Sequence, residues 1–251
     1  MQHSTLRQCG HRPWPLPPGP WVMEQRWEQL LFAHWRYPAG LVRPLVPESL
    51  PLDLWEGAAW VSVVPFVMRG VRARCTPALP WLSAFAELNV RTYVTVGGKP
   101  GVYFFSLDAA NPVAVRTARR WFHLPYFDAD MRIAQRGEQV RYRSRRTHRY
   151  APPAELGVAY QPVGYPFIAQ PGTLEHFLAE RYCLYSVRPD GQVMRGEIHH
   201  PPWVLQQAEA TFTTNSMLAA AGLPQPEVAP LLHVAADQRV IVWAPKVCAG
   251  D

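Results

Sequence analysis

Hydrophobic and polar residues alternate along several short segments of this chain, which is the pattern of half-buried β-strands. The clearest segment is residues 86–96 (AELNVRTYVTV), and it is followed by a Gly97-Gly98 turn and the apolar run GVYFFSLD. An alternating segment joined to an apolar run by a two-residue glycine turn predicts an antiparallel hairpin. Runs rich in β-branched and aromatic residues predict further strands at residues 59–68, 204–213 and 239–244.

Other segments complete a strand-rich pattern. Residues 27–37 fit both helical and strand spacing, and we interpret them as a strand. A strand pair is expected around Gly137. The Pro189-Asp190-Gly191 turn separates two more strands, the second of which runs into GEIHHPPW, where the prolines end it.

Two helices interrupt the strands. Asn111 followed by Pro112 is an N-cap and first-turn pair that predicts a helix to about Phe122. Thr173 caps a second predicted helix, LEHFLAERYCLY, whose apolar residues recur at helical spacing. We therefore predict an α+β, β-rich fold, a curved antiparallel sheet or barrel with a few inserted helices.

The chain is expected to form one domain over residues 23–251, since no linker follows residue 22. Hydrophobic residues make up 48% of the sequence and charged residues 18%, which is enough apolar side chain for a core. The first 22 residues are proline-rich and aperiodic, so we expect an N-terminal extension that is disordered and outside the fold. Whether Met1 or Met23 is the natural start stays open.

The net charge of +6 comes almost wholly from arginine, because Lys99 and Lys246 are the only lysines. The densest arginine run is RYRSRRTHRY, which could bind single-stranded nucleic acid or serve as a protein interaction module. Strand alternation instead places Arg141, Arg143 and Arg145 on one solvated face, which disfavours a nucleic-acid partner.

Cysteine usage and the absence of a long apolar run indicate the compartment. The four cysteines show no CxxC spacing, and no segment approaches the roughly 20 apolar residues of a membrane span. The first 20 residues also lack the apolar stretch of a signal peptide. We expect a cytoplasmic protein without a membrane partner, and leave homo-oligomerisation open.

Polar residues of the 86–96 segment form the main candidate site. Period two places Glu87, Asn89, Arg91 and Tyr93 on one face of the strand, while the opposite face is aliphatic. In a two-layer barrel the polar face would line a cavity that could hold an anionic ligand. On a sheet surface it would form an ordinary ion pair of no functional meaning.

A second candidate is His199. It shares a strand face with Glu197, so a carboxylate-oriented general base is one reading, and a structural histidine is the other. His200 points to the opposite face, so the two histidines cannot bind one metal ion. The sequence contains no HExxH, Walker or GxGxxG motif, and we expect neither a metal nor a cofactor.

Several long segments carry a resemblance to a known family. They include LLFAHWRYP, AWVSVVPFVMRGVR, FAELNVRTYV, GVYFFSLDAANPVAVRTARRWFHLPYF and GEIHHPPW. In this order, from about Met23 to Trp243, they resemble the uncharacterised YqjF-like family, which is assigned to the acetoacetate-decarboxylase-like fold. The function of that family is unassigned.

The resemblance to acetoacetate decarboxylases themselves is more distant. LVPESLPL is similar to a motif of those enzymes, and by that similarity Arg36 falls where they keep an arginine for the substrate carboxylate. Their tandem lysine pair, which supplies a Schiff-base amine, is replaced here by Arg119 and Arg120 in TARRWFHLPYF. Arginine stays protonated and cannot form an imine, so decarboxylation through a lysine imine is disfavoured.

Three functions stay open on this evidence. The first is a lysine-independent enzyme acting on a small anionic or oxo-acid-like ligand, with Glu87 and His199 as catalytic residues and Arg36, Asn89, Arg91 and Tyr93 as binding residues. The second is a binding module that uses the same pocket without chemistry. The third is a basic interaction module that uses the arginine run.

Overall fold

A computed structural model of the chain describes residues 3–79 and 81–248. Strands dominate the first half of the fold: β1 (Met23–Glu28), β2 (Leu30–Pro38), β3 (Ala58–Ala73), β4 (Phe85–Val96), β5 (Lys99–Ala109), β6 (Tyr126–Arg136) and β7 (Gln139–Arg146). The second half contributes β8 (Glu155–Ile168), β9 (Cys183–Val187), β10 (Val193–His199), β11 (Val204–Asn215), β12 (Leu231–Ala235), β13 (Gln238–Val242) and β14 (Lys246–Val247).

Short helices connect some of these strands. They are α1 (Ala39–Val42), α2 (Pro112–Trp121), α3 (Leu174–Ala179) and α4 (Met217–Ala220), with 3₁₀ turns at Ser4–Arg7 and Arg43–Leu45. Within the described residues no helix has the length and apolar character needed to cross a membrane. The predicted β-rich α+β class with a few inserted helices is confirmed.

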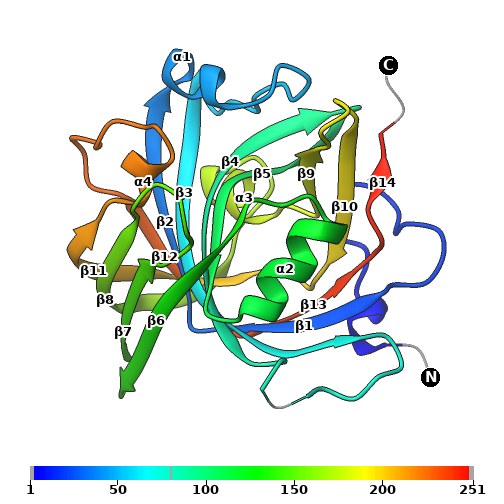
Figure 1. Ribbon diagram of the computed structural model, residues 1–251, viewed down its shortest axis with the longest axis horizontal. Coiled ribbons are helices and arrows are strands. Elements are labelled where there is room, and N and C mark those ends of the chain that lie inside the picture. The colour runs from blue at the N-terminus through cyan, green and yellow to red at the C-terminus, as the bar shows by residue number, and fades with distance from the viewer. Residues whose placement is uncertain (1–2, 80, 249–251) are drawn as a thin grey trace.

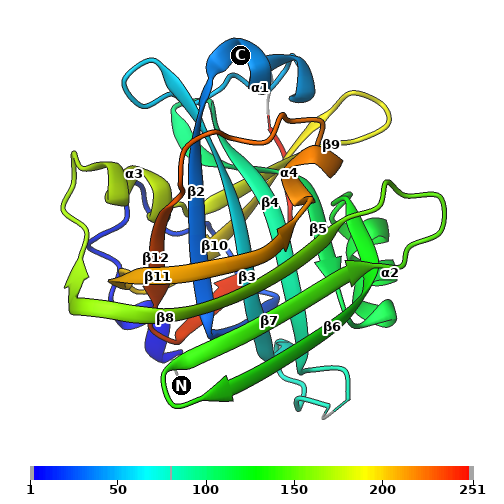
Figure 2. The same ribbon diagram turned by 90° about the vertical axis from the view of Figure 1, so that its left-hand side faces the viewer.

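The strands form one 14-stranded sheet that closes on itself twice (Figures 1 and 2). Pairing of β5 with β6 closes what we call the packed barrel, formed by β2, β3, β4, β5, β6, β7, β8, β11 and β12. Pairing of β1 with β3 closes what we call the cavity barrel, formed by β1, β3, β4, β5, β9, β10 and β13. The two barrels share β3, β4 and β5.

The shared strands are buried on both faces, because each face belongs to a different barrel. On β4, Leu88, Val90 and Val94 pack into the core of the packed barrel. Side chains between them point into the cavity barrel, where Phe66 and Met68 of β3 also face. The polar face predicted for β4 is therefore enclosed, because a second barrel covers the side that would meet solvent in a single sheet.

Most predicted elements lie where the sequence pattern placed them. The β4–β5 hairpin turns at Gly97 and Gly98, both with positive φ, and the Asn111 side chain caps α2 by accepting from the backbone N–H groups of Val113 and Ala114. The strand predicted over residues 27–37 is interrupted at Gln29, which has a φ of 53°.

The helix predicted after Thr173 is shorter than expected. It begins at the Thr173 cap but ends at Ala179, since Cys183 already starts β9, which pairs with both β5 and β10. The Arg181 side chain donates from Nε to the Phe177 carbonyl at 2.6 Å and satisfies a terminal acceptor of this helix.

The N-terminal segment packs on the domain. The sequence pattern had predicted a disordered extension outside the fold. Residues 1–2 lie outside the described part. Arg12 is buried and its guanidinium Nη2 lies 3.2 Å from the Glu197 carboxylate, which also accepts from the Trp14 indole at 3.0 Å. The segment therefore covers the outer face of β10, and we predict that the domain still folds without it.

Candidate functional site

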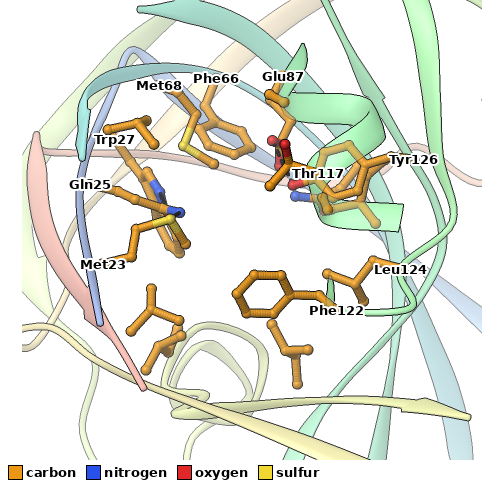
Figure 3. Close-up of a pocket in the computed structure, with 18 of the residues that line it drawn as sticks. Met23, Gln25, Trp27, Phe66, Met68, Glu87, Thr117, Phe122, Leu124 and Tyr126 are labelled. Carbon is orange, nitrogen blue, oxygen red and sulfur yellow. Dashed lines mark hydrogen bonds between the residues drawn. The ribbon is translucent and has the colours of Figure 1, made fainter. Parts of the chain in front are cut away.

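The cavity barrel encloses a cavity of about 650 Å³. Figure 3 shows the Glu87 carboxyl on one side of it, beside Thr117 and Tyr126, with Gln25 and Trp27 on the side across from them. Most of the wall is apolar and aromatic, and the polar groups are few. A concave, largely apolar space with a few convergent polar groups has the form of a small-molecule site.

Glu87 is a strongly perturbed carboxyl in the cavity wall. Its side chain is buried, and burial raises the pKa of its carboxyl from 4.5 to about 8. Asp108 on β5 adds to this increase, whereas a hydrogen bond from the Tyr126 hydroxyl to Glu87 Oε2, 2.9 Å long, opposes it. At neutral pH the carboxyl is therefore mostly protonated and can donate a proton inside the cavity.

Asn89 and Arg91 follow Glu87 on the same face and carry unused hydrogen-bonding capacity. The Asn89 side-chain oxygen and the Arg91 Nε are buried, and neither has a partner among the described residues. The Arg91 guanidinium lies 5.2 Å from the centre of the Phe32 ring and donates weakly to the Leu178 carbonyl at 3.4 Å. An incoming anion with a donor group would satisfy both atoms.

Tyr93 lies beyond Arg91, outside the residues that line the cavity, and its ring centre is 5.9 Å from the Arg91 guanidinium. Its hydroxyl lies 2.7 Å from Ser62 Oγ and donates to the Leu178 carbonyl at 3.0 Å. Ser62 in turn contacts Nδ1 of His34 at 2.6 Å, and burial lowers the pKa of this histidine well below its usual value. Because His34 is neutral, Arg91 is the charged residue among Arg91, Tyr93, Ser62 and His34.

The structure does not bring Arg36 or His199 to the cavity. Arg36 is exposed on β2, because alternation turns it away from the buried Trp35 and Tyr37. His199 is buried on the outer face of β10, where Nε2 contacts the Thr5 carbonyl at 3.0 Å. Burial lowers its pKa to about 4. His200 lines the cavity instead, in agreement with the opposite orientation expected for adjacent strand residues.

The cost of burying unpaired charges predicts an ion pair between Glu87 and an arginine, and the described residues form no such pair. Among the described residues Glu87 takes part in no salt bridge, and its partner is Tyr126. Glu87 and Arg91 are four residues apart on an extended strand, so their Cα atoms are separated by about 13 Å. Because Glu87 is buried without a neighbouring cation, its protonated form costs less free energy than its charged form.

Sequence reasoning missed three cavity residues that come from other strands or loops: Tyr126, Arg181 and His200. Arg181 is buried and forms an ion pair with Asp53. The one indication for His200 was strand alternation, which places it on the face opposite His199. Nothing in the local pattern marks Tyr126, which reaches Glu87 because β5 pairs with both β4 and β6.

Neither lysine lines the cavity. Lys99 Nζ lies 3.3 Å from the Glu197 carboxylate on the outside of β10, and Lys246 is exposed on β14. Arg119 and Arg120 are exposed on α2 and point away from the cavity. Across residues 3–79 and 81–248 no group of histidine, cysteine and acidic side chains has the arrangement of a metal site.

Solved structures with low sequence identity share this fold. The enduracididine biosynthesis enzyme MppR complexed with pyruvate matches with a TM-score of 0.62 and 12% identity, over 92% of this chain and 91% of that one. An acetoacetate decarboxylase from Legionella pneumophila matches with a TM-score of 0.60 and 12% identity, over 96% and 93% of the two chains. The acetoacetate-decarboxylase-like fold is therefore confirmed.

Sequence comparison gives the family. The model of DUF2071, described as an uncharacterized conserved protein, matches residues 24–239. The uncharacterized protein YqjF of Bacillus subtilis (strain 168) is 46% identical over 228 residues, which cover 91% of this chain and 93% of that protein. The chain therefore belongs to this family of uncharacterized conserved proteins, as the resemblance of its motifs indicated.

Proposed function

We propose that the cavity binds a small organic acid and that Glu87 exchanges a proton with it. The observation that carries this proposal is the placement of a buried carboxyl with a pKa of about 8 in the same cavity, and on the same strand face, as the incompletely bonded Arg91. Perturbed groups that face a cavity are typical of functional sites. The neighbour complexed with pyruvate supports a ligand of this class.

Arg91 is the residue suited to the acid group. Its guanidinium offers several N–H donors in one plane, and a carboxylate would meet the Nε that has no partner among the described residues. The cavity wall around it is mainly apolar, which strengthens such a contact over the same pair in water.

Glu87 is the residue suited to proton transfer. Its ionised form can take a proton from the carbon beside a ligand carbonyl. The C–H electron pair then forms a C=C bond, and the π pair of the carbonyl moves onto its oxygen. The protonated form then returns a proton to that carbon. A pKa near 8 keeps both forms accessible around neutral pH, and the Tyr126 hydroxyl stabilises the carboxylate between the two steps.

Calorimetric titration with 2-oxobutanoate tests the binding step. We expect saturable binding that weakens at least tenfold in Arg91→Met. Arg36→Met is the matched control, because this arginine is exposed on β2, and it should bind as the unchanged protein does. Absence of binding, or equal loss in both variants, would contradict the proposed site.

Binding without chemistry is the second candidate, and the predominance of apolar wall over polar groups favours it. Proton exchange distinguishes an enzyme from a binding module. In deuterated water, an enzyme of the proposed kind should exchange the C3 protons of 2-oxobutanoate, as followed by NMR, and Glu87→Gln should abolish the exchange while keeping affinity within a few fold. Binding without any exchange in the unchanged protein would leave the binding module.

A further inference from the structure

We propose that the ligand is an elongated, amphipathic acid whose apolar tail leaves the cavity between α2 and the loop that joins β3 to β4. This inference rests on the proposed function, since it assumes that the acid group lies at Arg91. It concerns what the rest of the cavity holds.

The polar groups are spread along one wall of the cavity. Glu87, Asn89 and Arg91 project into the cavity from alternate positions of one strand, and the outer two Cα atoms are about 13 Å apart. A ligand that runs along this wall from Arg91 would pass Asn89 and Glu87, which favours an elongated molecule.

The size and lining of the cavity point the same way. A volume of about 650 Å³ lies within the range for drug-sized ligands. Its walls present large apolar side chains, among them Trp27, Phe66, Met68, Phe104, Leu107 and Phe122. A compact acid at Arg91 would leave most of this surface facing water, whereas an apolar chain would cover it.

The rim of the cavity gives the direction of the tail. Val113 and Trp121 on α2 are 52% and 68% exposed, and Leu79 in the β3–β4 loop is 46% exposed, yet all three line the cavity. Along β4, Glu87 is nearer than Arg91 to this loop, which ends where β4 begins at Phe85. The apolar rim therefore lies at the Glu87 end, opposite the acid.

Helix α2 presents its apolar face to this rim. Its positions 113, 114, 117, 118 and 121 line the cavity, while its arginines face solvent. Among its ten residues only Val115 is buried, so most of the apolar face of this helix covers an opening and not a packed core. An apolar chain passing beneath it would complete the packing of that face.

A chain-length series tests the inference. Dissociation constants are measured by calorimetry for butanoate, octanoate and dodecanoate below their micelle concentrations. We expect affinity to rise at least a hundredfold from butanoate to dodecanoate, because each buried methylene can add up to roughly fourfold. Dodecan-1-ol should bind at least tenfold more weakly than dodecanoate, since it lacks the charge for Arg91.

Variants at the rim locate the tail. Trp121→Ser should weaken dodecanoate at least fivefold and leave butanoate unchanged. Trp81→Ser is the matched control, because Trp81 is 71% exposed and does not line the cavity, and it should change neither. If butanoate binds through Arg91 but chain length or Trp121 has no effect, the tail inference fails and the proposed function stands. If no acid binds at any length, the proposed function itself fails.

Discussion

The Tyr126 hydroxyl donates to the Glu87 carboxyl at 2.9 Å, and the two side chains come from the strands on either side of β5. The closure of the packed barrel by β5 and β6 therefore creates the immediate environment of the perturbed carboxyl in the cavity barrel. One long-range pairing sets both the fold and the chemistry of the candidate site.

The raised pKa of Glu87 predicts a stability that falls as pH rises. The folded state holds the proton up to about pH 8, whereas the unfolded chain releases it near 4.5, so the contribution is fully present below pH 4.5 and is lost between these values. The loss amounts to at most about 5 kcal/mol. In Glu87→Gln this part of the pH dependence should disappear.

Urea unfolding of both proteins between pH 4.5 and 9 measures the effect. The difference between them cancels contributions from Asp108, Arg146 and the tyrosines near Glu87, to the extent that the substitution leaves them unchanged. Glu138→Gln, in the exposed turn between β6 and β7, serves as the control and should keep the pH profile of the unchanged protein. Parallel profiles for Glu87→Gln and the unchanged protein would show that Glu87 ionises normally.

Tyr126→Phe should raise the pKa of Glu87 further. The hydroxyl stabilises the carboxylate form, so its removal leaves burial and Asp108 less opposed. The stability loss should be about 1–3 kcal/mol, the cost of an unmade buried hydrogen bond. Carbon NMR of the labelled Glu87 carboxyl follows the midpoint, with exposed Tyr150→Phe as the control. A downward shift would show that Tyr126 favours the protonated acid.

The sequence predicted which β4 residues share one face of the site, but not the strands that enclose that face. Alternation over residues 86–96 was sufficient to group Glu87, Asn89 and Arg91, because period two is a local property of a strand. Whether that face met solvent depended on β1, β10 and β13, which close the second barrel from distant parts of the chain. No local pattern reports such pairings.

The same limit explains the elements that were mispredicted. The run LEHFLAERYCLY has helical spacing throughout, yet Cys183 joins a strand because β5 and β10 offer it partners. The cost of burying unpaired charges predicts a Glu87–arginine pair, whereas strand geometry separates Glu87 from Arg91. Pairing across the sheet overrides local propensity at both places.

The buried ion pair of Asp108 and Arg146 should be costly to break. Arg146 donates from Nη2 to Oδ1 at 2.8 Å and from Nε to both carboxylate oxygens at 3.1 Å, with both side chains almost fully buried. Arg146→Met leaves the Asp108 charge uncompensated and should lower the free energy of unfolding by about 3–5 kcal/mol.

Two companion variants make this measurement specific. Arg145→Met, one residue away on the exposed face of β7, should change stability by less than about 0.5 kcal/mol. Adding Asp108→Asn to Arg146→Met should recover much of the loss, since the buried charge is then gone. Equal effects of Arg145→Met and Arg146→Met in urea unfolding would argue against a structural role for the pair.

No imine should form with oxo acids. Lys99 is held beside Glu197 and Lys246 is exposed, so neither amine is placed in the cavity with the ligand. Borohydride treatment in the presence of 2-oxobutanoate, followed by peptide mass spectrometry, should give no stable adduct on either lysine at the ligand concentrations that saturate the cavity. A stoichiometric adduct would restore a Schiff-base mechanism.

Deletion of residues 1–22 should leave a cooperatively folded domain of reduced stability. Every strand of both barrels lies at or after Met23, so the sheet does not need the segment. Glu197 would lose Arg12 and Trp14 but keep Lys99 and Arg195, each 3.3 Å away. A loss of a few kcal/mol corresponds to a melting temperature lower by about 5–15 °C.

Calorimetry of the shortened chain beside two full-length variants tests this account of the segment. Arg12→Met should reproduce part of the decrease in melting temperature, because this buried guanidinium also donates to the Ile198 carbonyl. Arg7→Met, whose side chain is exposed, should melt as the unchanged protein does. If the shortened chain showed no cooperative transition, residues 1–22 would have to count as part of the folding unit, since the strands alone would then be insufficient to hold the cavity barrel closed around β10.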